Sequence, residues 1–340
     1  MTNVLLVGGT SAGHLAPMVA VAEALEAAEP GIRLSFVCSD KPSDAAFLTL
    51  EKRSCFPLPL PRRNLLMPVT FLRAFLKSFA ILSHEKPDVV FSKGSAVSVP
   101  LCYAARMKGI PIVLHESDAV MGRASRQVAR VATETLLGTA IGNPIRARVT
   151  AGKKEEGLRI TGFSGAKPVL LVMGGSQGAR VINDCVTANL DAILASCDVI
   201  HLTGAGKNTM PNKPGYYATE FGSDVLPHLY AIATLAVSRA GAGSIAELAA
   251  CGIPAILVPI KGLAGDHQVK NAEAAEKTGA CVVLPQSDLD RLPSLATSLA
   301  ADAARLQTMR DSCRYAAAPE AARLIAERVL RSVARAGIGA

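Results

Sequence analysis

In the stretch Ser238-Arg-Ala-Gly-Ala-Gly-Ser-Ile-Ala-Glu-Leu248, the pattern predicts the end of a buried strand, a glycine turn and the first turns of a helix. Gly241 and Gly243 let the backbone turn tightly and let a ligand approach the main chain. We expect Ser244 to cap the helix, whose first amides have no partner within the helix. A helix N-terminus of this kind suits a phosphate group.

Glu247 lies one turn into the predicted helix, where its carboxylate could accept hydrogen bonds from the hydroxyls of a ribose. The alternative is a plain strand-to-helix turn in which the acid only suits the helix dipole. Two more glycine turns follow predicted strands, at 7–14 and 173–180. Three such turns favour a ligand that contains a nucleotide. None has the GxGxxG spacing of a dinucleotide-binding turn, which disfavours a nicotinamide oxidoreductase.

Composition narrows the possible partners. The 340 residues suit two domains, and the formal net charge of +8 fits nucleic acid, anionic lipid or a polyphosphate ligand. The lack of Trp and of long Lys/Arg runs disfavours nucleic acid. Eight scattered cysteines without CxxC pairs indicate reduced thiols and disfavour zinc, so we expect no metal.

The sequence also bears on location. It shows no signal-peptide pattern, and no apolar run approaches the ~20 residues that a membrane-spanning helix needs. We therefore expect a cytosolic protein that could lie on a membrane surface.

Strand and helix patterns alternate in two similar series, which predicts an α/β protein with two doubly wound parallel sheets. The regular pattern lapses between residues 138 and 168, where we place the domain boundary. We predict one domain at 1–146 and a second at 147–318. An amphipathic helix at 319–340 is predicted to pack on a domain edge, and could return to the first domain.

His14 follows the first glycine turn, at the carboxyl end of the first predicted strand. Ligands bind at that edge in open α/β sheets. A neutral imidazole there could take a proton from an incoming hydroxyl. The alternative is a histidine that only hydrogen-bonds a neighbouring loop.

Residues 62–82 carry large apolar side chains at helical spacing, with Arg73 and Lys77 between them. One interpretation is an ordinary helix that faces the core. The other is a basic amphipathic segment that rests on anionic lipid headgroups.

Other polar residues have two interpretations each. Ser176 could bind a phosphate or a sugar hydroxyl, or only cap a helix. Arg146 could reach the ligand from the linker, or remain a surface cation. Gln268 and Asn271 can donate and accept at once, as sugar hydroxyls require, or they only begin a helix.

As an ordered set, these motifs resemble the MurG family of glycosyltransferases, glycosyltransferase family 28. The resemblance covers about residues 4 to 284 and is carried by Gly8-Gly-Thr-Ser-Ala-Gly-His14, Ser92-Lys-Gly-Ser-Ala-Val-Ser-Val-Pro100, Pro111-Ile-Val-Leu-His-Glu-Ser-Asp118, Gly142-Asn-Pro-Ile-Arg146, Gly174-Gly-Ser-Gln-Gly-Ala-Arg180, Ser238-Arg-Ala-Gly-Ala-Gly-Ser-Ile-Ala-Glu247 and Asp266-His-Gln-Val-Lys-Asn271. It implies a GT-B fold, with two Rossmann-like domains facing across a cleft. The first domain would take the acceptor and face the membrane, and the second would bind the UDP-sugar.

The family resemblance also implies a reaction. It is the inverting transfer of N-acetylglucosamine from UDP-N-acetylglucosamine (UDP-GlcNAc) to an undecaprenyl-linked muramyl-pentapeptide, for peptidoglycan synthesis. It implies no cofactor and no metal. It places the enzyme peripherally at the cytoplasmic face of the cell membrane, with residues 62–82 on the anionic surface.

The resemblance assigns roles residue by residue. His14 would be the base, Glu247 would hold the ribose, and Gly243 and Ser244 would take the diphosphate. The other substrate contacts that it implies are Thr10, Ser11, Ala12, Gly13, Asp118, Arg146, Ser176, Ser223, Ala242 and Gln268. The chain departs from the family pattern at Ala12, in a first glycine loop that is one residue longer, and at Ser95-Ala96.

Three other functions remain open from the sequence. One is a GT-B transferase with a different lipid or small-molecule acceptor. Another is a UDP-GlcNAc epimerase or hydrolase, which would release UDP without an acceptor. The third is a non-catalytic binding protein in which the altered first loop has disabled His14.

Overall fold

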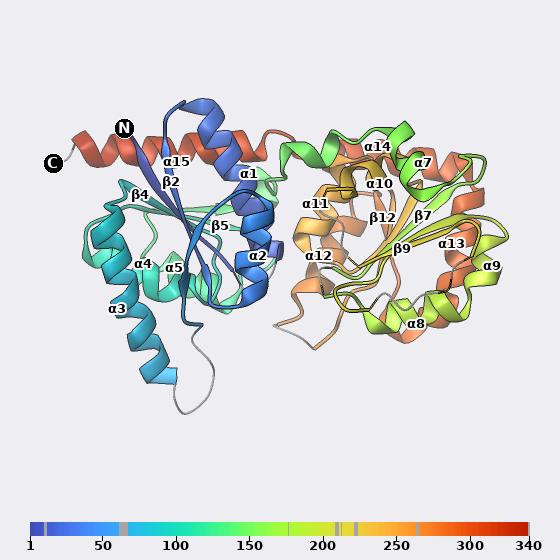
Figure 1. The fold of residues 1–340 in the computed structure, drawn as a ribbon, viewed down its shortest axis with the longest axis horizontal. Coiled ribbons are helices and arrows are strands. Elements are labelled where there is room, and N and C mark those ends of the chain that lie inside the picture. The colour runs from blue at the N-terminus through green and yellow to red at the C-terminus, as the bar shows by residue number, and fades with distance from the viewer. Residues whose placement is uncertain are drawn as a thin grey trace. The chain divides into compact units, whose positions relative to one another are not determined.

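The computed structural model describes residues 1–9, 12–60, 67–175, 177–207, 211, 213–220, 224–262 and 265–338. The chain divides into two compact units. The first unit comprises Met1–Arg146 and Pro319–Ala340, and the second comprises Ala147–Ala318. Each unit is built on one parallel sheet with helices on both of its faces (Figure 1).

The first unit has a six-stranded parallel sheet in the order β3-β2-β1-β4-β5-β6. Its strands are β1 (Asn3–Val7), β2 (Arg33–Ser39), β3 (Cys55–Leu58), β4 (Val89–Ser92), β5 (Ile112–Glu116) and β6 (Glu134–Leu137). Its helices are α1 (Ala12–Ala28), α2 (Pro42–Leu50), α3 (Met67–Glu85), α4 (Ser98–Met107), α5 (Arg123–Ala129), α6 (Gly138–Ile141) and α15 (Ala321–Ile338).

Both faces of this sheet are buried, which explains the continuous apolar run of β1. Val4 and Leu6 pack into a core with α1, α2 and α15, while Leu5 and Val7 pack on the opposite face with α3, α4 and α5. Successive side chains of a strand point to opposite faces, so a strand covered on both sides is mostly apolar, as β1 is from Val4 to Val7.

The second unit repeats the plan with the strand order β12-β11-β10-β7-β8-β9. Its strands are β7 (Val169–Met173), β8 (Asp198–Leu202), β9 (Tyr216–Thr219), β10 (Leu235–Ser238), β11 (Ala255–Leu257) and β12 (Cys281–Val283). Its α-helices are α7 (Lys154–Thr161), α8 (Arg180–Ala188), α9 (Leu190–Leu194), α10 (Leu226–Ile232), α11 (Ala242–Ala250), α12 (His267–Glu276), α13 (Leu292–Ala301) and α14 (Ala303–Ala316), with short 3-10 helices η1 (Ala147–Thr150) and η2 (Gln286–Arg291).

Each sheet has a topological switch point, where the strand order reverses beside the first strand of the unit. In the first unit it lies between β1 and β4, and in the second between β7 and β10. Open α/β sheets bind ligands outside the carboxyl ends of the strands at such points. The turns that contain His14 and Gly243 follow β1 and β10, so both lie at switch points.

Helix α15 belongs to the first unit, although it is the last helix in the sequence. It packs along α1 (Figure 1), and Ile325, Ala326 and Val329 are buried in the same core as Val4 and Leu6. The C-terminal segment is therefore part of the core of the N-terminal unit.

Candidate functional site

His14 lies in the first turn of α1, because this helix begins at Ala12. Its Nδ1 is 3.2 Å from the main-chain oxygen of Lys93, which directly follows β4. A carbonyl oxygen only accepts, so this contact assigns the proton to Nδ1 and leaves the lone pair on Nε2. Burial and then the charge of Lys93 lower the pKa of His14, and the ring is neutral at pH 7.

A buried polar network lies next to His14. The Nζ of Lys93 is 2.5 Å from Nδ1 of His115 and 2.7 Å from Oγ of Ser117. Glu116 accepts from the backbone N–H groups of Asp118 and Gly122, at 3.0 and 3.2 Å. Lys93, His115 and Glu116 lie within the motifs quoted above, but no pattern in the sequence marks them as a network.

Some of the residues predicted to contact the substrates lie in this region. Asp118 is half-buried, and its carboxylate raises the pKa of His14, in opposition to burial and Lys93. Gly13 is exposed in the first turn of α1. Thr10 and Ser11 lie outside the described residues, and of Ala12 the structure describes only that its backbone begins α1.

The turn after β10 presents an uncapped helix N-terminus. Helix α11 begins at Ala242 with Gly241 at the N-cap position, and no side chain caps it. The prediction that Ser244 caps the helix is wrong, because the helix starts three residues earlier than that prediction requires and Ser244 lies within its first turn. A Cβ added at Gly243 would meet no atom within 4 Å, so the chain leaves open space beside this residue.

A buried tyrosine forms a hydrogen bond with the carboxylate of Glu247. The hydroxyl of Tyr230, in α10, donates to Oε2 of Glu247 at 3.0 Å, and Tyr230 is only 2% exposed. Asn271 is also buried, and its Nδ2 donates to the oxygen of Ala240 at 3.1 Å. Asn271 therefore supports the turn before α11. No sequence pattern marked Tyr230, since a tyrosine in an apolar helix is an ordinary core residue.

Two other predicted contacts have defined environments. Gln268 is half-buried in α12, and its Oε1 accepts from the backbone N–H of Ile260 at 3.2 Å. Arg146 is 5% exposed within the first unit, where its guanidinium lies 2.6 Å from Oε1 of Glu51 and over the ring of Phe47. A contact between Arg146 and the UDP-sugar stays a prediction. Ser176 and Ser223 lie outside the described residues.

The turn after β7 depends on glycine. Gly178 has a φ of +65°, and a Cβ at this residue would stand 2.0 Å from the main-chain oxygen of Thr203. The close approach fixes the turn 174–178 against the end of β8. A left-handed backbone and a steric clash both oppose any other residue type here.

We expect Gly178→Ala to destabilise the protein by about 2–4 kcal/mol, because strain and clash add. Gly206→Ala is the matched control, since Gly206 has a φ of +70° but nothing within 4 Å of an added Cβ. It should cost only about 1–2 kcal/mol, the strain alone. Urea unfolding of both variants measures the difference, and equal losses would show that the contact with Thr203 adds nothing.

A third feature lies on the surface of the first unit. Helix α3 buries Ala74, Ser78, Ile81, Leu82 and Glu85. Its outer face exposes large apolar side chains, namely Met67, Val69, Leu72, Leu76 and Phe79. The prediction of an ordinary core helix therefore describes only one side of α3.

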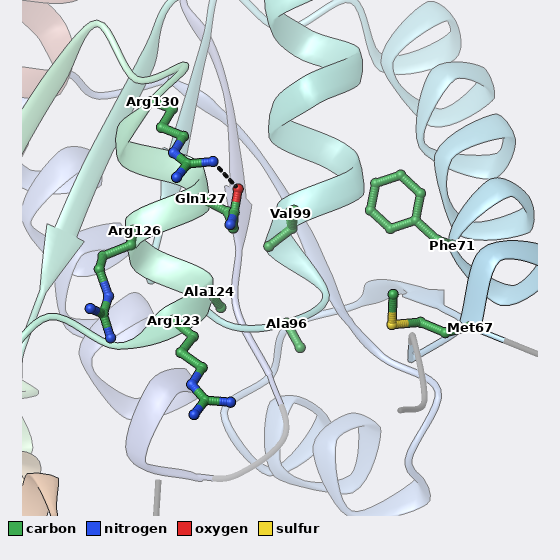
Figure 2. A pocket seen from close by; sticks show the side chains of 9 residues that line it. All are labelled: Met67, Phe71, Ala96, Val99, Arg123, Ala124, Arg126, Gln127 and Arg130. Carbon is green, nitrogen blue, oxygen red and sulfur yellow. Dashed lines mark hydrogen bonds between the residues drawn. The ribbon is translucent and has the colours of Figure 1, made fainter. Parts of the chain in front are cut away.

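A pocket of about 480 Å³ adjoins this helix, and we name it the α3–α5 pocket. Figure 2 shows Met67 and Phe71 of α3 on one side and the side chains of α5 on the other. The lining residues are Met67, Phe71, Ala96, Val99, Arg123, Ala124, Arg126, Gln127 and Arg130. The pocket thus combines an apolar wall with three arginines.

The described residues include neither a membrane-spanning helix nor a cluster of metal ligands. No described helix is long and apolar enough to cross a membrane. No three His, Cys, Asp or Glu side chains among the described residues are grouped so that they could hold a metal ion.

Comparisons with known proteins agree with this architecture. The model of the glycosyltransferase family 28 N-terminal domain matches residues 4–137, and that of the C-terminal domain of the same family matches residues 169–329. A relative from Clostridium perfringens is 36% identical over 313 residues, which cover 85% of this chain and 87% of the relative. It is named UDP-N-acetylglucosamine–N-acetylmuramyl-(pentapeptide) pyrophosphoryl-undecaprenol N-acetylglucosamine transferase.

Solved structures share the fold. The crystal structure of Acinetobacter baumannii MurG matches with a TM-score of 0.74 and 24% identity, over 97% of this chain and all of that chain. A UDP-GlcNAc 2-epimerase from Neisseria meningitidis, solved with UDP-GlcNAc bound, matches with a TM-score of 0.67 and 14% identity, over 97% of this chain and all of that chain. The two parallel sheets and these neighbours confirm the predicted GT-B class of two Rossmann-like domains. By its family models and its relatives, the chain belongs to glycosyltransferase family 28.

Proposed function

We propose that this chain transfers N-acetylglucosamine from UDP-GlcNAc to an undecaprenyl-diphosphate-linked muramyl-pentapeptide, with inversion at the anomeric carbon, in peptidoglycan synthesis. The observation that carries the proposal is the neutral His14 at the switch point of the first unit, whose contact to Lys93 through Nδ1 leaves the lone pair on Nε2. The relatives named for this reaction, with up to 36% identity, supply the substrates.

The second unit is proposed to bind the donor. The amides of Ala242, Gly243 and Ser244, at the uncapped start of α11, suit a diphosphate, since unpaired N–H groups and the helix dipole both attract anions. Glu247, oriented by Tyr230, accepts from the ribose hydroxyls. The remaining donor contacts that we propose are Arg146, Ser176, Ser223 and Gln268.

The first unit is proposed to bind the acceptor. The acceptor contacts that we propose are Thr10, Ser11, Ala12, Gly13 and Asp118. The Nε2 of His14 takes the proton of the attacking hydroxyl as its oxygen bonds to the anomeric carbon. The bond from that carbon to UDP breaks at the same time, and the N-terminus of α11 stabilises the charge that UDP gains.

The test is transfer of labelled N-acetylglucosamine to a lipid-linked muramyl-pentapeptide analogue, with a reaction that lacks the acceptor beside it. We expect product only when the acceptor is present. Release of UDP without acceptor would instead support an epimerase or hydrolase, the second candidate, whose fold the Neisseria enzyme shares. UDP-GlcNAc binding with no turnover in either reaction would refute the acceptor assignment.

We also propose that the enzyme binds peripherally to the cytoplasmic face of the cell membrane through the outer face of α3. Five of the twelve exposed large apolar side chains of the described residues lie on this helix. A basic side chain lies beside these apolar ones, since the Nζ of Lys108 is 4.3 Å from the ring centre of Phe79. Apolar side chains with basic neighbours favour an anionic lipid surface. The arginines of the α3–α5 pocket add positive charge beside this face.

Replacing Leu72 and Leu76 by Ser should lower binding to phosphatidylglycerol vesicles by about 10-fold to 100-fold, because two half-exposed leucines no longer enter the interface. Transfer to a water-soluble acceptor should not change. Val181→Ser, at an exposed apolar residue of the second unit, is the control and should bind vesicles normally. Vesicle sedimentation measures the binding, and an unchanged double variant would exclude α3 as the contact.

A further inference from the structure

Lys93 is a buried cation for which the proposed reaction provides no role. It follows β4 at the switch point of the first unit and is only 2% exposed. A lysine is rarely buried to this degree unless its ammonium has polar partners, because removal of the charge from water is costly. The side chain is too deep to touch a substrate, so any function of Lys93 acts through its neighbours.

Three contacts of Lys93 join three separate segments. Its main-chain oxygen accepts from Nδ1 of His14 at 3.2 Å, at the start of α1. Its Nζ donates to Nδ1 of His115 and to Oγ of Ser117, at the end of β5. The direction of the His115 contact is settled by Gly142, whose oxygen lies 3.0 Å from Nε2. That nitrogen must donate, so Nδ1 of His115 accepts.

We propose that Lys93 is a positioning residue for the transfer, which locks the ring of the base His14 to the loop that carries Asp118. The inference rests on the proposed role of His14. Lys93 fixes the tautomer of His14 through its main-chain oxygen, and it holds the 115–118 segment through its side chain. The ammonium of Lys93 also places a positive charge near the imidazole of His14.

The charged groups around the pair determine the effect on protonation. His14 on α1 faces Lys93 after β4, Glu116 at the end of β5 and Asp118 beyond it. Burial and then Lys93 lower the pKa of His14, and Asp118 and Glu116 oppose them. Burial lowers the pKa of Lys93 to about 7, with Glu116 and Asp118 opposing. Lys93 is thus charged below about pH 7, where His14 titrates, and it disfavours the imidazolium.

The sign of the expected change follows from this arrangement. Lys93→Met removes the cation and keeps the length of the side chain. The imidazolium of His14 then meets only the negative charges of Glu116 and Asp118 and the cost of burial. Lys93→Met should therefore raise the pKa of His14. The acidic limb of the pH profile of kcat/KM for the acceptor should move to higher pH by the same amount, while the KM for UDP-GlcNAc stays unchanged.

The experiment is an NMR titration of the imidazole nitrogens of His14, with His14→Gln used to assign the signals. In the wild type we expect the proton on Nδ1 and a pKa below 6.5. Lys93→Arg retains the charge and should retain the low pKa. Lys154→Met removes an exposed lysine of the second unit and should leave the His14 titration unchanged.

Two results would overturn the inference. One is a wild-type His14 that carries its proton on Nε2, or that titrates at or above pH 6.5, and this needs no variant to fold. The other is the same His14 pKa in the wild type and in Lys93→Met. The titration uses no substrate, so a failure of the transfer assay with the expected titration would refute the proposed function and still support the link between Lys93 and His14.

Discussion

His14→Ala should lower the kcat of transfer by about 100-fold to 10,000-fold, the usual contribution of a positioned general base. The physical reason is the lone pair on Nε2, which the contact between Nδ1 and the main-chain oxygen of Lys93 leaves able to accept a proton. The affinity for UDP should not change, because His14 is not among the residues proposed to bind UDP. Single-turnover transfer at saturating donor and calorimetric binding of UDP measure the two effects separately.

The same residue predicts the pH dependence. Only neutral His14 can accept a proton, and its lowered pKa means that activity persists below pH 6.5 and falls as the pH drops through the lowered value. The variant should lose this acidic limb. His84→Ala is the control, since the side chain of His84 is 76% exposed on α3. Wild-type turnover by His14→Ala with bound donor would show that the base is a different group.

Glu247→Ala should weaken binding of UDP by about 10-fold to 100-fold, with a smaller effect on kcat. Hydrogen bonds to a charged group contribute about 1.5–3 kcal/mol, and the variant would lose those to the ribose. Tyr230→Phe should cause an intermediate loss, because the carboxylate keeps its charge but loses the donor that orients it. Calorimetric titration with UDP measures all three proteins.

A ligand without the ribose hydroxyls separates this role from a general disturbance of α11. Wild type and Glu247→Ala should bind 2′,3′-dideoxy-UDP with the same weak affinity. If the variant still bound the dideoxy ligand ten times more weakly than the wild type, the carboxylate would be acting on another part of the nucleotide or on the helix itself.

The architecture was predictable where local pattern and burial agree. Strand β1 is apolar from Val4 to Val7 and β7 is apolar at every position, because both faces of each sheet are covered, and the glycine turns directly follow them. The strands β3 and β9 were not predicted. Both lie at sheet edges, and β3 (Cys-Phe-Pro-Leu) contains a proline, so their short patterns resemble loops.

The glycine turns of the site were predictable from the sequence, but the residues that hold His14 and Glu247 in place were not. His14 and Glu247 stand next to glycines at strand ends, which sequence shows directly. The partners Lys93 and Tyr230 are 79 and 17 residues away in the chain, and only the folded sheet brings them into contact. Ser244 was misplaced as a cap because the helix begins at Ala242, three residues before the predicted start, and helix boundaries are the least certain part of a sequence-based prediction.

Helix α15 has a consequence for how the protein is made. The core of the first unit needs Ile325, Ala326 and Val329, which leave the ribosome after the whole second unit has been synthesised. Until then the core of the N-terminal sheet lacks the side chains of α15, while the later unit, continuous in sequence from Ala147 to Ala318, has all of its residues available for folding. The unit that begins synthesis first is therefore the last to have its chain complete, and a chain that ends at residue 318 would contain the whole second unit and only part of the first.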